Sequence, residues 1–202
     1  YDSCRLLAIN LYSYVVNPFK PDAYFDFDLF KNHVALAQRI MDDIIDLELE
    51  KIERIMAKID SDPENEDVKH TESVLWQKIY KKSGQGRRTG VGITAEGDML
   101  AALGLRYGTE EATEFAEKVH QTVALSAYRS SVEMAKERGA FEVYDSEREK
   151  NNPFINRLRE ADPELYEEMK KYGRRNIACL TIAPTGTTSL MTQTTSGIEP
   201  VF

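Results

Sequence analysis

The apolar positions of the chain repeat most regularly between Asp26 and Ile59, where they recur at steps of three or four residues. They are Phe30, Val34, Ala37, Met41, Ile45, Leu49, Ile52, Ile55 and Ile59. A stripe with this period predicts one long amphipathic helix, and Asp26 or Asp28 is suited to cap its first turn. We interpret the acidic run from Asp42 to Glu50 as a solvent-facing surface of this helix, because basic residues follow within one or two turns.

Further helices are indicated by their caps and stop signals. A turn at Ser61 to Glu66 precedes an expected helix from Asp67 to Lys82. A second helix is expected from Thr109 to Arg138, with the threonine as N-cap, two glutamates in the first turn and a glycine directly after the end. The proline of Asp162-Pro163-Glu164 suits a first helical position and predicts a helix that runs to Gly173.

Two other stretches are short and almost continuously apolar, which is the pattern of strands buried within a sheet. Cys4 to Val16 is rich in β-branched and aromatic residues and ends at Asn17-Pro18. Ile177 to Ala183 follows a charged stretch and is stopped by Pro184. Strands near both ends of the chain, with long helices between them, predict an α/β fold that is rich in helix.

Composition and charge narrow the classes of protein to which the chain can belong. Of its 202 residues, 42% are hydrophobic and 30% are charged, which is typical of a folded globular domain. The net charge of −8 argues against nucleic acid as a partner, because a phosphate backbone would be repelled. No apolar run has the length of a membrane span and no signal peptide is visible, so we expect a cytoplasmic protein that does not bind membranes.

A turn rich in proline, glycine and hydroxyl side chains follows the second apolar stretch. Thr185, Gly186, Thr187, Thr188 and Ser189 offer hydroxyls, backbone amides and, at the glycine, space for close approach of an anion. If a short helix starts near Thr187, its free amides and its dipole add to the attraction. A Walker loop is excluded because no lysine follows the glycine. The alternative is an ordinary strand-to-helix turn in which a threonine or serine caps the helix.

The sequence NIACLTIAPTGTTSLMTQTTSGIEPVF at the end of the chain resembles the substrate-diphosphate loop of the ribonucleotide reductase catalytic chain, most like its adenosylcobalamin-dependent, class II branch. Three other blocks also resemble that family, in the expected order. They are SCRLLAINL near the start, RRTGVGITAEGDMLAALGL from Arg87, and Asn152-Pro153-Phe154. The resemblance covers essentially the whole chain. It implies that residues 1–202 are a single internal segment of the ten-stranded α/β barrel of the catalytic domain, incomplete at both ends.

The resemblance implies two kinds of site residue. A loop would hold the diphosphate of a ribonucleoside diphosphate, or the corresponding triphosphate, and its residues are Ala183, Pro184, Thr185, Gly186, Thr187, Thr188 and Ser189. Cys4 would be one of two redox-active thiols that reduce the substrate and close into a disulfide, with its partner upstream of Tyr1. Cys179 stands where the family commonly has an apolar residue, so we expect it in the core. The glycines of the block from Arg87 would allow close backbone packing.

The cofactor and the partners follow from the same resemblance. In the family a thiyl radical abstracts the 3′ hydrogen of the ribose, and adenosylcobalamin generates that radical in the class II branch. We therefore expect adenosylcobalamin as cofactor, and a thioredoxin-type reductant and the remainder of the reductase chain as partners, with a homodimer left open. The radical cysteine is expected before Tyr1, so the isolated segment should not turn over.

Two other functions stay open at this stage. A ferritin-like di-metal bundle uses two carboxylate-x-x-His pairs together with two further carboxylates. The candidates are Glu117-x-x-His120, Asp67-x-x-His70, and Asp43 or Asp46. One pair carries aspartate in place of glutamate, and we expect no metal site. The other alternative is a non-catalytic phosphate-binding module in which only the hydroxyl-rich turn matters.

Overall fold

Two parallel strands form the centre of the fold in the computed structural model of the chain, which describes residues 5–200. β1 (Leu6–Asn10) pairs with β4 (Gly90–Thr94), with the first residues of the two strands opposite each other. The stretch after Asn176 runs along the other edge of β4, where Val91 forms a parallel bridge with Leu180. All five residues of β4 are buried, as expected of a strand with neighbours on both edges.

The stretch from Ile177 to Ala183, predicted as a strand, joins the sheet only through its middle. The amide of Val91 donates to the carbonyl of Cys179 at 2.7 Å, and the amide of Thr181 donates to the carbonyl of Val91 at 3.1 Å. Beyond this point the chain leaves the sheet, and Ile182 is 59% exposed. The prediction of a regular buried strand is therefore wrong for the last residues, because their backbone forms no ladder with β4.

The first apolar stretch is divided rather than continuous. β1 ends at Asn10, whose side chain accepts a hydrogen bond from the amide of Tyr12 at the start of the 3-10 turn η1 (Leu11–Tyr14). β2 (Val15–Val16) and β3 (Tyr24–Phe25) then pair antiparallel as a small second sheet. A side chain that bonds to the backbone two residues on competes with the strand ladder. This explains why the apolar run does not continue as one strand.

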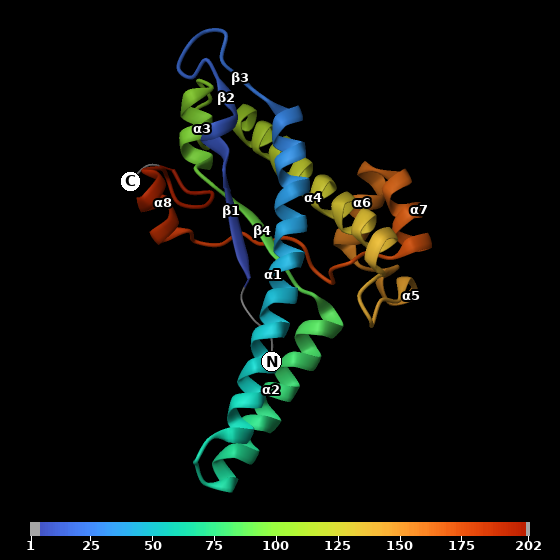
Figure 1. Cartoon of the computed structure of the whole chain (residues 1–202). Coiled ribbons are helices and arrows are strands. Elements are labelled where there is room, and N and C mark those ends of the chain that lie inside the picture. Colours follow the sequence, from blue (N-terminus) through green and yellow to red (C-terminus); the bar gives the residue numbers. More distant parts are fainter. Residues whose placement is uncertain (1–4, 201–202) are drawn as a thin grey trace.

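A long antiparallel hairpin connects β1 to β4. It consists of α1 (Phe27–Ser61) and α2 (Glu66–Gly86), and Figure 1 shows it extending past the end of the sheet. Asp26 caps α1 by accepting a hydrogen bond from the amide of Leu29 at 2.9 Å, as the sequence predicts. Most of the predicted apolar stripe of α1 is buried. Parallel strands need such a crossover connection.

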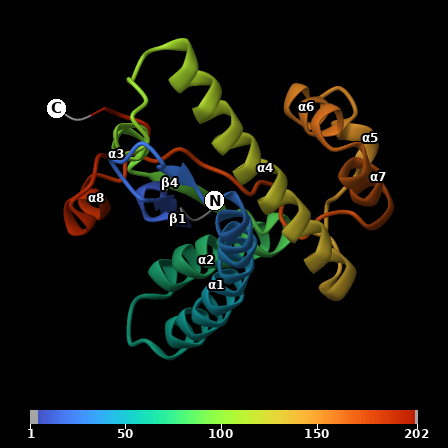
Figure 2. The ribbon, with the colours of Figure 1, turned by 90° about the horizontal axis from the view of Figure 1, so that it is seen from above.

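The chain after β4 is mostly helical. The helices are α3 (Glu96–Ala102), α4 (Glu110–Arg138), α5 (Ser146–Glu149), α6 (Pro153–Ala161), α7 (Pro163–Tyr172) and α8 (Gly186–Thr192). The side chains of Thr109 and Asp162 cap α4 and α7, which confirms both predicted starts. Seen from above in Figure 2, α5, α6 and α7 gather at one end of α4, and α8 lies on the opposite side of the molecule.

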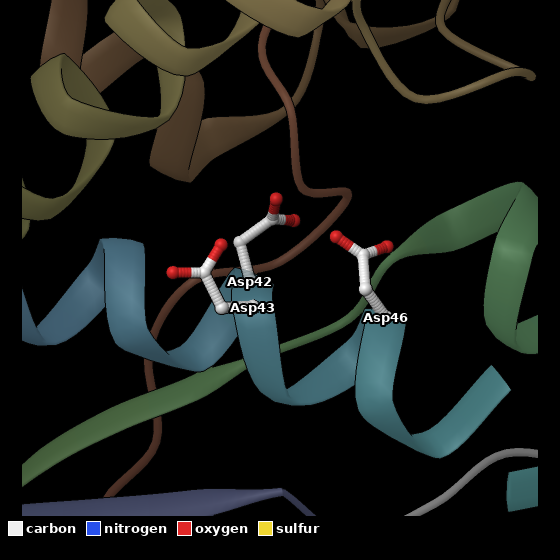
Figure 3. Close-up of side chains that lie close together, drawn as sticks. All are labelled: Asp42, Asp43 and Asp46. Carbon is white, nitrogen blue, oxygen red and sulfur yellow. The ribbon is translucent and has the colours of Figure 1, made fainter. Parts of the chain in front are cut away.

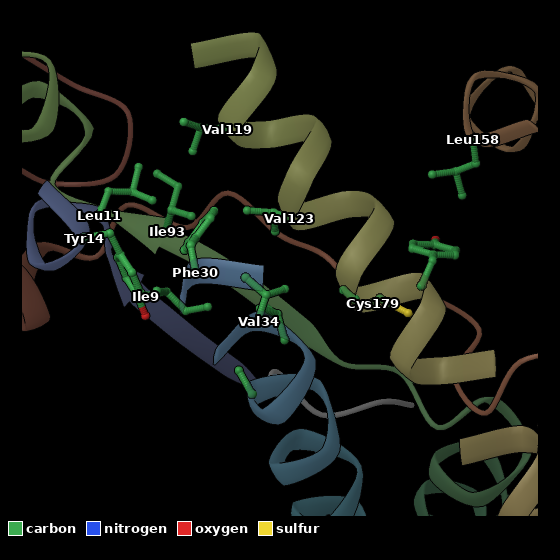
Figure 4. Packing of buried hydrophobic residues seen from close by; sticks show 14 of the residues in the cluster. Ile9, Leu11, Tyr14, Phe30, Val34, Ile93, Val119, Val123, Leu158 and Cys179 are labelled. Carbon is green, nitrogen blue, oxygen red and sulfur yellow. The ribbon is translucent and has the colours of Figure 1, made fainter. Parts of the chain in front are cut away.

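The hydrophobic core lies between the strands, α1 and α4 (Figure 4). Phe30 and Val34 of α1 meet Ile93 of β4 and Val119 and Val123 of α4, and each of these side chains is at most 4% exposed. Full burial of such a side chain contributes about 1.5–3 kcal/mol. The two long helices are therefore fixed against the central strand by their apolar faces.

The helix-rich α/β class predicted from the sequence is confirmed. Within residues 5–200 the strands form two sheets of two strands each and do not close into a barrel. None of the helices in that range combines the length and the apolar character that a membrane crossing requires.

A fully buried carboxylate, Asp42 of α1, joins this helix to two distant segments. The Arg87 guanidinium donates to it at 2.8 Å, the Arg175 guanidinium at 3.2 Å and the Asn176 side-chain amide at 2.9 Å. Burial alone would raise the pKa of Asp42, but these donors outweigh it and the pKa is lowered. The interpretation of the acidic run as solvent-facing is therefore wrong for Asp42, because its counter-charges come from 45 and 133 residues away.

We expect Asp42→Asn to lower the free energy of unfolding by about 3–5 kcal/mol, because Arg175 loses its buried counter-charge and Arg87 keeps only the half-exposed Asp46. Asp43→Asn is the matched control, since Asp43 is 57% exposed and pairs with Arg138 at the surface. Its effect should stay below about 1 kcal/mol. Urea denaturation of both variants measures the difference, and equal effects would contradict the role given to Asp42.

The pH dependence of the unfolding free energy gives a second test of Asp42. Because the pKa of Asp42 is lowered by folding, its contribution to stability is present above the ordinary value of 3.8 and is lost as the pH falls through the lowered value. The unfolding free energy of Asp42→Asn should therefore decline less steeply than that of the wild type on the acid side.

Candidate functional site

A cleft of about 160 Å³ opens between β1, β4 and the hydroxyl-rich turn. Its lining residues are Leu6, Leu7, Ala8, Gly92, Ile93, Thr181, Ala183, Pro184, Thr185 and Thr188. Four of the predicted phosphate-binding residues thus share one cleft with the strand that follows Cys4 in the sequence. Cys4 itself lies outside the described residues. The structure therefore brings together the turn and β1, the two parts of the chain that the resemblance assigns to one active site.

Two glycines of β4 allow the neighbouring chain segments to approach. A Cβ added at Gly92 would lie 2.4 Å from the carbonyl oxygen of Thr181, and one added at Gly90 would lie 2.9 Å from the carbonyl oxygen of Arg5. Real Cβ atoms essentially never come under 3.0 Å. The predicted structural role of these glycines is confirmed, and Gly92 also forms part of the cleft wall.

The turn places Thr185 directly before α8 in a left-handed conformation, with φ of 53°. This conformation is unusual for a β-branched residue. The side chain of Thr185 occupies the N-cap position but makes no capping hydrogen bond to α8. The alternative of an ordinary threonine-capped turn therefore fails in its main feature, and the first-turn amides from Gly186 to Thr188 are left without a side-chain cap.

The hydroxyl proton of Thr185 is already used within the protein. Thr94 donates its own proton to the carbonyl oxygen of Thr195 at 3.0 Å, so it can only accept from Thr185, whose oxygen lies 3.0 Å away. The amide of Gly197 in turn donates to the Thr185 oxygen at 2.7 Å. Thr185 therefore has no proton left for a ligand.

The hydroxyl proton of Ser189 is also used within the protein, so Ser189 cannot donate it to a ligand. Its hydroxyl donates to the carbonyl oxygen of Gly186 at 2.8 Å and accepts from Ser196 at 2.7 Å, and the residue is 3% exposed. Thr187 and Thr188 are exposed, and their hydroxyls make no hydrogen bond to another residue in the range 5–200. Of the four hydroxyls that the sequence treats alike, two hold the turn and two are available to a ligand.

The chain after α8 folds back onto the start of α3. Thr195 and Asp98 bond reciprocally: the carboxylate accepts from the amide of Thr195 at 2.6 Å, and the amide of Asp98 donates to the Thr195 hydroxyl at 3.3 Å. A Cβ at Gly97 would lie 2.7 Å from the carbonyl oxygen of Glu199. Sequence reasoning missed Thr94 and Asp98. The available signal was Gly97 itself, because glycine in the first turn of a helix is unfavourable unless another segment packs closely there.

Cys179 is fully buried beside α4, as predicted (Figure 4). Burial raises the pKa of its thiol to about 12. A thiol that stays protonated reacts slowly and forms no disulfide readily, because the thiolate is the nucleophile. The structure therefore gives Cys179 a packing role.

The acidic group of α1 is neutralised by arginines. The carboxylates of Asp42, Asp43 and Asp46 have oxygens within 4.8 Å of one another (Figure 3), but Arg87 bonds to Asp42 and Asp46, and Arg138 to Asp43. Guanidinium groups therefore fill the positions that a metal ion would take. This cluster therefore gives the di-metal alternative no support.

The two histidines of the di-metal alternative lie away from the acidic group of α1. His120 of α4 bonds to Glu96 of α3 at 2.7 Å. His70 belongs to the first turns of α2, at the far end of the helical hairpin (Figure 1). The two carboxylate-x-x-His pairs therefore belong to different regions of the fold and do not converge on the acidic group.

Comparison with known proteins gives the family. The family model described as "Ribonucleotide reductase, barrel domain" matches residues 1–202. The chain belongs to this family. Among its relatives are the vitamin B12-dependent ribonucleoside-diphosphate reductases of Thermoplasma acidophilum, 32% identical, and of Mycobacterium tuberculosis, 29% identical. Both alignments cover 100% of this chain but 20% and 22% of the relative.

A third relative belongs to a group without vitamin B12 in its name. The ribonucleoside-diphosphate reductase subunit alpha of Chlamydia pneumoniae is 26% identical over 98% of this chain and 18% of its own length. The chain thus spans about a fifth of the length of the curated relatives that it matches.

The blocks that carry the family resemblance surround one cleft. β1 comes from the first block, and β4 and α3 come from the second. The last block contains the turn and the return segment, which is the stretch 193–200 that folds back onto α3. The short block Asn152-Pro153-Phe154 lies elsewhere: Asn152 caps α6, and Phe154 packs against Tyr128. In this ribonucleotide reductase segment, therefore, most of the family-like sequence builds or supports the cleft.

We expect Cys179 to resist alkylation in the folded 202-residue chain because its pKa is raised by burial. The sequence contains two cysteines, so a Cys4→Ser variant reports on Cys179 alone and a Cys179→Ala variant reports on Cys4. Iodoacetamide at pH 8, followed by mass spectrometry, should label Cys179 only after urea is added. Rapid labelling without urea would contradict its assignment to the core.

We expect Gly92→Ala to displace the segment around Thr181 and to lower the free energy of unfolding by about 1–3 kcal/mol, as overpacking does. Gly84→Ala is the matched control, because the nearest atom to its added Cβ is 4.0 Å away. It lies within α2, where alanine should keep or raise stability by about 0.5–1 kcal/mol. Thermal or urea unfolding measures both, and a neutral Gly92→Ala would show that the close approach is not required.

Proposed function

We propose that this segment forms the phosphate-binding wall of a ribonucleotide reductase active site, in a catalytic chain that reduces ribonucleotides to deoxyribonucleotides by thiyl-radical chemistry. One observation carries the proposal: Ala183, Pro184, Thr185 and Thr188 of the turn line the same cleft as β1. Membership of the reductase family supports it. Because the relatives compared are named ribonucleoside-diphosphate reductases, we propose a ribonucleoside diphosphate as substrate.

The proposed phosphate contacts come from backbone amides and two hydroxyls. The amides from Gly186 to Thr188 have no side-chain cap, and Thr187 and Thr188 are exposed at the start of α8. Amides and hydroxyls that point at one anion bind phosphate without a lysine. Ala183 and Pro184 shape the wall of the cleft, and Thr185 and Ser189 hold the turn in place.

We propose Cys4 as one of the two reducing thiols. Two thiols release two electrons and two protons as they close into a disulfide, while the ribose gains hydrogen at C2′ and its 2′ hydroxyl leaves as water. The partner thiol and the radical cysteine are proposed to lie in other parts of the catalytic chain, so the isolated segment would bind substrate without turning it over. A thioredoxin-type protein is the proposed reductant of the disulfide.

We propose adenosylcobalamin as the cofactor of the whole chain, because two of the relatives are named vitamin B12-dependent. When bound, it supplies the radical that starts the reaction. The cleft of about 160 Å³ is below the size of ordinary small-molecule pockets, roughly 300–1,000 Å³, so it does not fit a corrin ring. The cofactor would then be held by other parts of the chain.

The ten-stranded barrel is part of the same proposal. In this view β1, β4 and the stretch around Leu180 are neighbouring barrel strands, and α1 and α4 are part of the outer helical layer. Leu6 of β1 is 50% exposed, as expected if a further strand lies beside it. The description of the matching family as a barrel domain supports this arrangement.

We expect Thr187→Glu to weaken binding of a ribonucleoside diphosphate to the full-length catalytic chain by at least about tenfold, or about 1.4 kcal/mol. The added carboxylate repels phosphate, yet a glutamate in the first turn of a helix favours the helix itself. Isothermal titration calorimetry with the diphosphate, and with the nucleoside that lacks phosphates, measures the effect. Thr113→Glu, on the exposed face of α4, is the control. Unchanged diphosphate affinity in Thr187→Glu would contradict the proposed phosphate site.

A further inference from the structure

We infer that Thr94 is a positioning residue of the phosphate-binding turn, and that it is held in place by Thr195 and Asp98. This inference rests on the proposed function, because the turn matters only if it binds the substrate. None of the three residues lines the cleft. Their effect on a ligand would therefore pass through Thr185, with which Thr94 makes direct contact.

Thr185 needs an external restraint. It is β-branched and adopts φ of 53°, a conformation that such residues avoid. Residues held in sparsely populated conformations persist only where the surrounding structure determines them, and they cluster at ligand-binding sites. The turn therefore depends on the two hydrogen bonds that the Thr185 hydroxyl makes, to Thr94 and from Gly197.

Thr94 provides a rigid end for this restraint. It is the last residue of β4, is 1% exposed, and has a single hydroxyl that bonds to both Thr185 and the carbonyl oxygen of Thr195. Gly92, two residues earlier on the same strand, lines the cleft. Thr94 therefore ties the turn to the strand that forms the opposite wall of the cleft.

Thr195 is itself fixed by the start of α3. Its carbonyl oxygen accepts from the amide of Ala95 at 3.0 Å as well as from Thr94, and it exchanges two hydrogen bonds with Asp98. Four hydrogen bonds thus join Thr195 to the end of β4 and the start of α3. Because Thr195 cannot move away, the Thr94 hydroxyl keeps one orientation and accepts the proton of Thr185.

The experiment compares variants of the full-length catalytic chain that differ in one hydroxyl. Thr94→Val keeps the shape of the side chain and removes the hydroxyl, whereas Thr94→Ser keeps the hydroxyl. Thr113→Val is a control on the exposed face of α4. Dissociation constants are measured for a ribonucleoside diphosphate and for the matching nucleoside. We expect Thr94→Val to weaken diphosphate binding about tenfold, with nucleoside binding within twofold of wild type. Thr94→Ser and Thr113→Val should both behave like wild type.

A double-variant cycle covers the case in which Thr94→Val folds poorly. Thr185→Ala keeps a residue that tolerates the left-handed conformation, as Ala95 does with φ of 66°, and it breaks the same hydrogen bond. Thr185→Ala also removes the hydrogen bond from the amide of Gly197. If Thr94 acts through Thr185, Thr185→Ala alone should therefore weaken diphosphate binding at least as much as Thr94→Val, and adding Thr94→Val to it should change little.

The outcomes separate this inference from the proposed function. If the wild-type chain binds the diphosphate and Thr94→Val and Thr185→Ala bind it equally well, the positioning role is overturned and the phosphate site stands. An equal loss of diphosphate and nucleoside binding also overturns it, since a general loss of structure would affect both ligands. If the wild type shows no preference for the diphosphate over the nucleoside, the proposed phosphate site fails, and this inference fails with it.

Discussion

A carboxylate removed from water must be neutralised by its neighbours, and Asp42 is fully buried. Its neutralising groups come from Arg87, at the end of α2, and from Arg175 and Asn176, at the start of the last segment. If either segment moved away, Asp42 would lose one of its cationic partners while it remained buried. The ion cluster therefore fixes the chain just before β4 and the chain just before residues 177–183 against the same point of α1.

Arg174 extends this constraint to the other end of the molecule. Its guanidinium is fully buried, bonds twice to Glu149 at 2.5 Å, and also donates to the carbonyl oxygens of Asn176 and Ile177 at 3.0 Å. It lies between the rings of Tyr128, Phe141 and Tyr144. The backbone from residue 174 to 177 is thus held by side chains before the sheet begins. This explains how a segment with a single bridge to β4 can still present its turn in a fixed position.

Local patterns were sufficient to predict much of this arrangement. The stripe of α1 and its cap at Asp26 follow from periodicity and capping chemistry, because each depends on residues nearby. The buried position of Cys179 was expected from the family resemblance. Asp42 was misjudged because Lys51, Arg54 and Lys58 follow the acidic run on the same helix, whereas its actual partners are remote in sequence. Ile177 to Ala183 was predicted as a strand because apolar character indicates burial but does not specify which backbone groups find partners.

The turn shows most clearly where sequence reasoning stops. Its sequence supplies several hydroxyls, and nothing in their spacing distinguishes those that hold the turn from those that face a ligand. The distinction depends on where each single proton goes, which is settled by Thr94 and Gly197 for Thr185. Glycine at position 185 would adopt the left-handed conformation without strain, but it would have no hydroxyl to bond to β4. A strained threonine tied to a buried strand therefore gives a turn that is ordered without a ligand, and such order would lower the entropy lost at the proposed phosphate site.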